Sequence, residues 1–473
     1  MKNWLKKYDL LILILLIGLG LRIYHLGHES LWLDEAVTIS GAGTNLANIF
    51  HSFWTMDYNP SLFWLILHYW MQIFGTSEFA TRFLSVIFGL GDLLMVYMIG
   101  KLIFNRKIGL LATLLMALSI FHIAYSQEAR MYSLLMFLSL ASMYFFIELL
   151  NKKGVKYIYG YIIFSILALY SHTFGFLIII VQNIYYFSLY QKLKKTLKLK
   201  YWILIQALLM VLILPWFILL YRQIAISDND VWKLPFKLIN LAYIVEDFAG
   251  SRLLLLIFTL SILAAVFSEI SFKRLLTRGK NIFLLLLWLV VGIVTPFFIS
   301  YFFASMYLSA KYSIVALPAF YLLVAKGLSN IKNKYFFNLI LMAIIILASI
   351  NIWSYFSDTH KDQWREAVAY IESRAETKDL LVFVYGYHQI PYDYYGKRHD
   401  LEKKSLLTNY RVLKTEDLNN LNLKAENQQK IWIILNQPIE NCNYQEVFDN
   451  YLKGYSLSQF TQFYNIELFE YTK

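Results

Sequence analysis

Two adjacent carboxylates, Asp34 and Glu35, follow the first long apolar stretch of the sequence in the segment Leu-Trp-Leu-Asp-Glu. If that stretch crosses a membrane, the pair lies at the membrane edge, where a carboxylate is costly to desolvate and is by default a candidate for function. The alternative is an acid pair that only marks the end of a helix in water. The remaining polar residues bear on this choice.

The same kinds of polar residue recur at the ends of other apolar stretches. They are Glu128 and Arg130 in the segment Ser-Gln-Glu-Ala-Arg-Met-Tyr at 126–132, His172, Lys311 and Tyr312, and the pair Tyr58 and Asn59. Cations together with carboxylates suit a reaction whose leaving group is a lipid phosphate, because cations hold the phosphate while a carboxylate takes a proton from the acceptor.

No cofactor is required by this pattern. Oxygen ligands in scattered loops could gather a divalent ion, but no spacing of acids and histidines in the sequence predicts a metal site. The single Cys442 excludes an internal disulfide and a cysteine-based metal cage.

The composition is that of a membrane protein. Hydrophobic residues make up 59% of the 473 residues and charged residues 16%, and the mean hydropathy is +0.51. Soluble domains have roughly 45–50% apolar and about 25% charged residues. The net charge of +12 would fit nucleic-acid binding, but the lysines form short clusters between apolar stretches, as in cytoplasmic loops of multi-pass proteins. No nucleic-acid partner is therefore expected.

Eleven apolar stretches approach the ~20 residues that a spanning helix needs. They are 9–27, 83–104, 108–125, 131–150, 157–171, 173–190, 201–221, 251–269, 281–302, 312–329 and 335–353. The stretch 60–74 is shorter. If it does not cross, the N-terminal lysines and the later basic clusters all lie on one side, which the positive-inside rule makes the cytoplasm. We therefore expect 60–74 to lie at the outer interface of the cell membrane, with the N-terminus inside and the C-terminal domain outside.

Polar residues become more frequent from about residue 358. Helical periodicity at 361–370 and 444–452 and apolar strands at 380–385 and 430–435 follow. We expect two domains, a transmembrane catalytic domain at 1–353 and a small extracytoplasmic α/β domain at 354–473. Because the second domain has no phosphate-loop or metal-spacing motif, it is interpreted as a lid or an acceptor-docking module.

Five short segments follow one another along the chain. They are Leu-Trp-Leu-Asp-Glu at 31–35, Tyr-Asn-Pro at 58–60, Arg-Phe-Leu-Ser at 82–85, the segment at 126–132, and Leu-Tyr-Ser-His-Thr-Phe-Gly at 169–175. In this order they resemble the GT-C membrane glycosyltransferases, especially relatives of the protein O-mannosyltransferases and of the lipid A aminoarabinose transferase. The resemblance covers about residues 1–350 and includes Lys311 to Pro318. Residues 362–365, Asp-Gln-Trp-Arg, resemble a motif that often opens the family's external domain.

The resemblance implies a function and a set of roles. Members transfer a sugar from a polyprenyl-phosphate carrier, with inversion, to an acceptor outside the membrane. By this resemblance Asp34 is the general base, Glu35 supports it or orients the sugar, and Glu128 is a second acid. The residues expected to bind the donor are Arg130, His172, Lys311, Tyr312, Tyr58 and Asn59.

Two departures from the family limit this transfer of roles. Asn59-Pro60-Ser61 stands where members often have His-Pro-Pro, so no histidine role carries over to that segment. Lys311 stands where members usually have arginine, which keeps the charge but loses the bidentate guanidinium.

Other functions stay open from the residues alone. A flippase or other transporter would place charges at mid-span and show repeated halves with broken helices, whereas the charges here avoid the centres of the apolar stretches. A ligase or polymerase that moves whole glycans would use a similar lipid-linked donor. The sequence names neither the sugar nor the acceptor, which could be a protein, a glycan or a lipid.

Overall fold

The computed structural model describes residues 2–55, 62–152, 154–226, 237–268, 279–302, 310–407, 428–437, 443–452 and 454–473. The chain forms two compact units. The first comprises Met1–Leu26, Asn45–Gly75 and Ala80–Ser357, and the second comprises Gly27–Thr44, Thr76–Phe79 and Asp358–Lys473.

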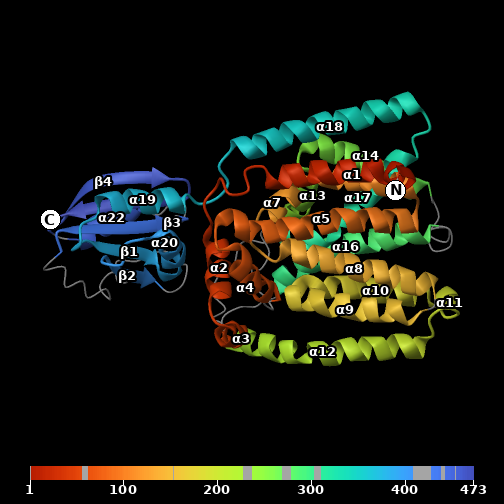
Figure 1. The fold of residues 1–473 in the computed structure, drawn as a ribbon, viewed down its shortest axis with the longest axis horizontal. Helices are drawn as coiled ribbons and strands as arrows, with labels where there is room; N and C mark the ends of the chain where they lie inside the picture. Colours follow the sequence, from red (N-terminus) through yellow and green to blue (C-terminus); the bar gives the residue numbers. More distant parts are fainter. Residues whose placement is uncertain are drawn as a thin grey trace. The chain divides into compact units, whose positions relative to one another are not determined.

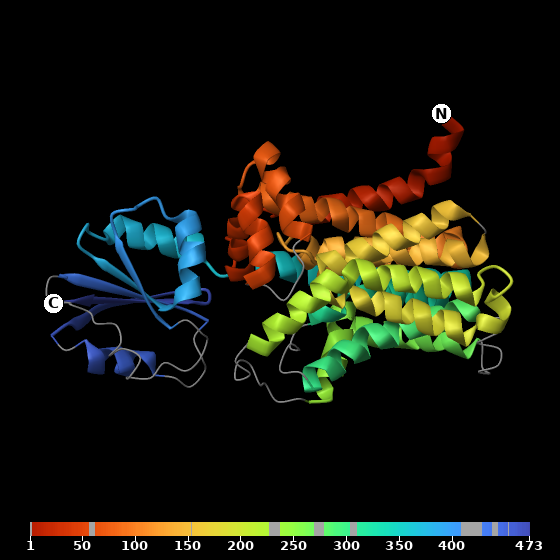
Figure 2. The same cartoon turned by 90° about the horizontal axis from the view of Figure 1, so that it is seen from below.

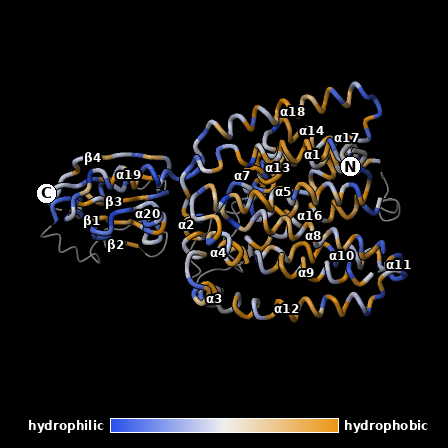
Figure 3. Tube along the Cα trace, in the orientation of Figure 1, coloured by the Kyte–Doolittle hydropathy of each residue, from blue (hydrophilic) through white to orange (hydrophobic). Residues whose placement is uncertain are grey.

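The first unit is built from helices that run side by side along much of their length (Figure 1, Figure 2). Hydrophobic residues continue along these helices (Figure 3). The helices are α1 (Lys2–Ile23), α3 (Leu46–Thr55), α4 (Leu62–Phe74), α5 (Glu78–Ile103), α6 (Arg106–Ala117), α7 (Ile120–Ser126), α8 (Tyr132–Asn151), α9 (Val155–Ser171), η1 (Thr173–Gly175), α10 (Phe176–Ser188), α11 (Tyr190–Leu193), α12 (Leu199–Ile226), α13 (Ile239–Ala249), α14 (Arg252–Phe267), α16 (Lys280–Phe302), η2 (Ala310–Ala316), α17 (Leu317–Ser329) and α18 (Lys334–Ser357).

Among the described residues, six helices are long and apolar enough to cross a membrane, or eight if each of two bent pairs is one span. The six are α5, α8, α12, α16, the continuous η2 and α17, and α18. Shorter apolar helices are α4, α9, and η1 with α10. The structure therefore bears out a largely helical membrane protein with several apolar helices, and does not by itself fix the expected number of eleven.

A different feature of the chain accompanies each bend. Between α6 and α7 the axis turns by 67°, and the side chain of Arg22 donates to the carbonyls of Met116 and Ala117 at the end of α6, at 3.5 and 3.3 Å. Between α13 and α14 the axis turns by 94° at Gly250. Gly250 has a φ of +85°, a left-handed conformation that glycine adopts without strain.

The second unit contains a five-stranded sheet in the order β2-β1-β3-β5-β4. Strand β1 pairs in parallel with β2 and β3, and β5 is antiparallel to β3 and β4. The strands are β1 (Leu380–Tyr385), β2 (Glu402–Leu407), β3 (Lys430–Asn436), β4 (Ser456–Phe463) and β5 (Ile466–Thr472), and the helices are α2 (Leu33–Gly43), α19 (Trp364–Arg374), η3 (Gly386–His388), α20 (Gln389–Tyr395) and α22 (Tyr444–Tyr451).

Helices cover both faces of this sheet (Figure 2). Alternate residues of β1 show why: Leu381 and Phe383 pack with Trp364 of α19, whereas Leu380 and Val382 pack with α22. A strand buried on both faces has a continuous run of apolar residues. Strands β1 and β3 have such runs, and for this reason they could be predicted from the sequence.

The second unit also contains two segments from the N-terminal part of the chain. Residues 27–44, which include α2, and residues 76–79 belong to it. Helix α2 packs against α20. The first turn of α2 carries Asp34 and Glu35, so this acid pair belongs to the same compact unit as the C-terminal sheet.

Candidate functional site

Tyr132, the first residue of α8, is the centre of a cluster of cationic and aromatic side chains. The Lys311 ammonium lies 5.7 Å from the centre of the Tyr132 ring, and the Arg130 guanidinium carbon lies 6.0 Å from it. Lys311 also lies 5.6 Å from the centre of the Tyr312 ring. These distances are within the range of cation–π attraction. We call Arg130, Tyr132, His172, Lys311 and Tyr312 the cation cluster.

His172 joins this cluster from the end of α9. Its ring centre lies 6.0 Å from that of Tyr132 and 6.1 Å from that of Tyr312, and its ring is within electrostatic reach of Arg130 and Lys311. The backbone N–H of Phe174 donates to Nδ1 at 3.0 Å, so the neutral ring carries its proton on Nε2. Nε2 is buried and has no hydrogen-bond partner among the described residues. His172 therefore brings an N–H donor to the cluster.

Local structure fixes the turn that carries Arg130. The backbone N–H of Arg130 donates to the carbonyl of Glu128 at 2.8 Å, and the Ser85 hydroxyl donates to the carbonyl of Arg130 at 3.3 Å. Arg130 and Glu128 thus leave one short turn between α7 and α8. The Arg130 side chain belongs to the cation cluster, and the Glu128 side chain lines the neighbouring pocket.

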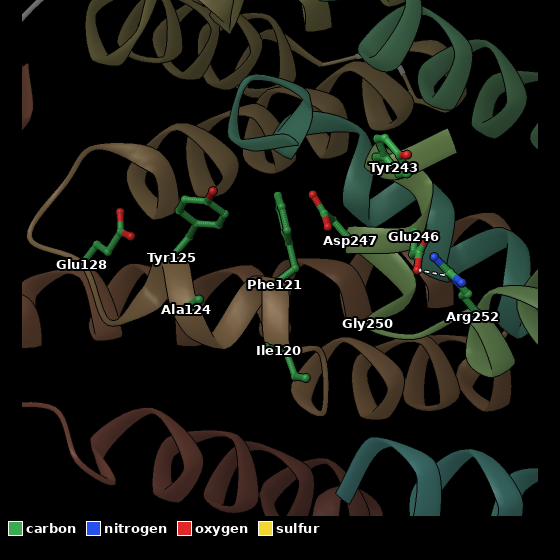
Figure 4. Close-up of a pocket in the computed structure, with 10 residues that line it drawn as sticks. All are labelled: Ile120, Phe121, Ala124, Tyr125, Glu128, Tyr243, Glu246, Asp247, Gly250 and Arg252. Carbon is green, nitrogen blue, oxygen red and sulfur yellow. Dashed lines mark hydrogen bonds and ion pairs between the residues drawn. The ribbon is translucent and has the colours of Figure 1, made fainter. Parts of the chain in front are cut away.

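A pocket of about 580 Å³ is lined by residues of α7, of α13, of the turns that follow them and of the start of α14 (Figure 4). Phe121 and Tyr125 of α7 contribute aromatic faces, and Glu128 and Asp247 contribute carboxylates. The remaining lining residues are Ile120, Ala124, Tyr243, Glu246, Gly250 and Arg252. Aromatic faces and hydrogen-bond acceptors in one cavity suit a polyhydroxylated ligand.

The pocket adjoins the cation cluster through Tyr125. This residue lines the pocket, and its ring centre lies 5.2 Å from that of Tyr132. Arg252, the basic residue among the lining set, pairs with Glu246 at 3.1 Å. The pocket lining therefore carries more negative than positive charge, whereas the cation cluster beside it is positively charged. A ligand with a neutral polar group in the pocket and an adjoining anionic group at the cluster would match both.

Asp34 and Glu35 lie in the second unit and have different environments. Glu35 is fully buried, and Lys361, itself 9% exposed, donates to its carboxylate at 3.1 Å. Asp34 is partly exposed, and its backbone carbonyl accepts from the Thr38 hydroxyl at 2.8 Å. Carboxylates in the first turn are favourable because the helix N-terminus carries partial positive charge. The more accessible acid is thus Asp34, and Glu35 is committed to an ion pair.

Asp362 is a third acid near this pair. It is buried, and Asn465 donates to its Oδ1 at 3.0 Å. Burial raises the pKa of Asp362, hydrogen bonds from neighbouring side chains oppose the rise, and the negative charge of Asp34 adds to it. The charge of Asp34 therefore acts on a buried carboxyl at the start of the Asp-Gln-Trp-Arg segment.

The structure brings five of the expected residues together in the first unit and two in the second. Glu128, Arg130, His172, Lys311 and Tyr312 belong to the pocket and the cation cluster, and Asp34 and Glu35 share the first turn of α2. Tyr58 and Asn59 lie outside the described residues. No group of three or more His, Cys, Asp and Glu side chains in the described ranges could hold a metal ion.

Sequence reasoning missed several residues of these sites. They are Tyr125 and Tyr132, Glu246 and Asp247, and Lys361. Glu246 and Asp247 are adjacent acids that follow apolar residues, as Asp34 and Glu35 do, so that signal was present in the sequence. Nothing local marks Lys361, because its partner lies 326 residues away.

Parts of the sequence match a known family and a relative. Residues 57–219 match the model of the family described as dolichyl-phosphate-mannose-protein mannosyltransferase. An uncharacterized protein of Aquifex aeolicus (strain VF5) is 25% identical over 228 residues, and the match covers 46% of this chain and 44% of that relative.

Two proteins of known structure are similar in fold. ArnT from Cupriavidus metallidurans superposes with a TM-score of 0.65 at 10% identity over 98% of both chains, and it has also been solved bound to undecaprenyl phosphate. The Archaeoglobus fulgidus oligosaccharyltransferase superposes with a TM-score of 0.60 at 14% identity, over 92% of this chain and 70% of that chain. The resemblance to the GT-C membrane glycosyltransferases is confirmed, and the chain has their fold.

Proposed function

We propose that this protein is a membrane glycosyltransferase that takes a sugar from a polyprenyl-phosphate donor and transfers it to an acceptor. The observation that carries the proposal is the cation cluster beside a pocket of about 580 Å³. Two cations and the His172 N–H suit a phosphate, and the pocket suits a sugar. The fold supports this because ArnT, which shares it, has been solved with undecaprenyl phosphate.

In the proposed reaction Asp34 is the general base. It takes the proton from the acceptor hydroxyl as the acceptor oxygen attacks the anomeric carbon, and the bond between that carbon and the phosphate oxygen breaks. The electron pair leaves with the polyprenyl phosphate, whose negative charge Arg130, Lys311 and the His172 N–H stabilise. Attack opposite to the leaving group inverts the anomeric configuration. No metal or other cofactor is part of this scheme.

We further propose eleven spans with the second unit outside. Eight spans, counted with each bent pair as one, together with the shorter α9 and the continuous η1 and α10 (Thr173–Ser188) make ten, and α1 is the eleventh. Residues 27–44, 76–79 and 358–473 form one compact unit, so an even number of crossings must separate these segments. Helix α4 has 13 residues and is shorter than each of these spans. Its length of about 20 Å against a core of ~30 Å supports its place at the interface.

The test is donor consumption by the purified protein in lipid vesicles. Radiolabelled polyprenyl-phosphate monosaccharides are supplied with crude acceptor fractions, and the wild type is compared with Asp34→Asn. We expect the wild type to consume one donor and Asp34→Asn to lose about 10²–10⁴-fold in turnover, the usual contribution of a general base. Asp393→Asn, the same change at a more exposed acid of the second unit, is the control and should keep wild-type turnover.

Three outcomes would contradict parts of this proposal. Full turnover by a folded Asp34→Asn variant would remove Asp34 as the base. Consumption of lipid-linked oligosaccharides but of no monosaccharide donor would favour a ligase that moves whole glycans. Movement of intact donor across the bilayer without sugar release would favour a transporter.

A further inference from the structure

The ion pair between Glu35 and Lys361 joins the acid next to Asp34 to the segment that opens the C-terminal domain. The Lys361 ammonium lies 3.1 Å from Glu35 Oε2, and their side chains are 10% and 0% exposed. A buried ion pair contributes little net stability, because desolvation offsets the attraction, but removing one partner is strongly destabilising. Such a pair is well suited to fixing an orientation.

Hydrogen bonds also hold the residues just before Asp34 to residues 358–473 of the second unit. The Ser30 hydroxyl donates to the carbonyl of Asp362 at 2.8 Å, and the backbone N–H of Leu31 donates to the Tyr395 hydroxyl at 2.7 Å. The chain is therefore held on the N-terminal side of Asp34 by these bonds and on the C-terminal side by Glu35.

The second N-terminal segment is held in the same way. Arg365 donates to Glu78 at 3.1 Å and also to the carbonyl of His28. The Tyr395 hydroxyl donates to Glu78 at 3.0 Å, and the Tyr394 hydroxyl donates to the carbonyl of Thr76 at 2.6 Å. The segment at 360–366 and helix α20 thus bind both N-terminal segments of the unit.

We propose that Lys361 is a positioning residue for Asp34. Neighbouring residues of a helix point about 100° apart, so fixing Glu35 against Lys361 fixes the rotation of the first turn of α2 and with it the direction of the Asp34 carboxylate. The C-terminal domain is then part of the catalytic apparatus rather than a lid or docking module alone. This inference rests on the proposed role of Asp34 as the base.

The test uses a double-mutant cycle in the full-length protein. Variants Glu35→Gln, Lys361→Met and the double variant are compared for melting temperature, for binding of undecaprenyl phosphate, and for kcat with the donor that the wild type consumes. Each single variant leaves one buried charge unpaired and should melt at a lower temperature. The double variant should regain most of the melting temperature and bind undecaprenyl phosphate like the wild type, yet keep a kcat at least about tenfold lower.

Two further variants complete the experiment. The exposed pair of Lys404 and Glu402 serves as the control, because Lys404→Met with Glu402→Gln makes the same chemical change and should alter nothing. Glu35→Asp keeps the charge but shortens the side chain by one methylene. It should fold and lose kcat without losing affinity for undecaprenyl phosphate, which tests the proposal even if the neutral variants fail to fold.

The proposal is overturned if the folded double variant or Glu35→Asp has wild-type kcat, since the pair would then only stabilise the unit. It is also overturned if kcat and affinity for undecaprenyl phosphate fall together. Failure of the proposed function looks different, because the wild type itself would then show no donor consumption that depends on Asp34.

Discussion

At the scale of residues, the cation cluster makes a direct prediction about binding of a lipid phosphate. A charge-assisted hydrogen bond contributes about 1.5–3 kcal/mol, and each 1.4 kcal/mol is about tenfold in affinity. Arg130→Gln and Lys311→Gln should therefore each weaken binding of undecaprenyl phosphate about 10- to 100-fold, measured with radiolabelled lipid and protein in vesicles. Lys332→Gln removes an exposed cation of the first unit and is the control.

A third variant tests the kind of cation that the cluster needs at position 311. Lys311→Arg keeps the charge and restores the guanidinium that the resembling family usually has, so we expect it to bind at least as tightly as the wild type. Equal affinity for Lys311→Gln and the wild type would exclude Lys311 from the phosphate site, and equal loss in Lys332→Gln would show only a general effect of net charge.

At the scale of elements, a buried polar chain holds the bend that presents α7 to the pocket. Besides its bonds to the α6 carbonyls, the Arg22 side chain contacts His122 Nδ1, and His122 Nε2 lies 3.1 Å from Asp92 Oδ2. All three side chains are nearly or fully buried. Helices α1, α5 and α7 are joined by this chain, and α7 carries Phe121 and Tyr125 of the pocket.

Removing Asp92 should cost several kcal/mol of stability, because the buried Arg22 guanidinium and His122 ring then lose their acid partner, about 3–5 kcal/mol for a broken buried pair. We expect Asp92→Leu to lower the melting temperature clearly and Lys332→Met, at an exposed site, to leave it unchanged. Thermal unfolding of the detergent-solubilised variants measures this. An unchanged melting temperature in Asp92→Leu would show that the bend is set by backbone packing alone.

The elements also show which parts of the fold the sequence could predict. The strands at 380–385 and 430–435 and the helix at 444–452 were found because each has a continuous apolar run or a helical repeat. Strands β2 and β4 contain exposed polar residues. They therefore lack the continuous apolar run that predicted β1 and β3, and their sequences resemble those of loops. The bend after α6 was also missed, because Arg22, about 95 residues away, supplies its hydrogen bonds.

At the scale of the whole molecule, the assignment of Asp34 to the C-terminal unit was not predictable from local patterns. The expected boundary near residue 353 follows the change of composition, but residues 27–44 are held to the C-terminal unit by contacts such as that of Ser30 with Asp362, 332 residues apart. Pairs this distant leave no periodicity in the sequence. Arg130, His172, Lys311 and Tyr312 of the cation cluster could be nominated from the sequence, because each lies at the end of an apolar stretch.

The last prediction concerns the side of the membrane on which the second unit lies. Helix α18 is one of the helices apolar enough to span, and it separates the exposed Lys332 from the exposed Gln459 of β4. In a Cys442→Ser background, Gln459→Cys should react with a membrane-impermeant maleimide in intact spheroplasts, and Lys332→Cys only after permeabilisation. The positive-inside rule gives this direction, since Lys326, Lys332 and Lys334 cluster at the N-terminal end of α18.

Labelling also tests the chemistry, because the second unit carries Asp34. If Gln459→Cys and a cysteine introduced at the exposed Ser40 of α2 both react from outside, the proposed base faces the outer side, where the proposed acceptor lies. If Gln459→Cys reacts only after permeabilisation, the whole unit faces the cytoplasm, and the proposed transfer on the outer side is wrong. If the two positions label from opposite sides, residues 27–44 and 358–473 cannot form one unit, and the positioning role of Lys361 fails with it.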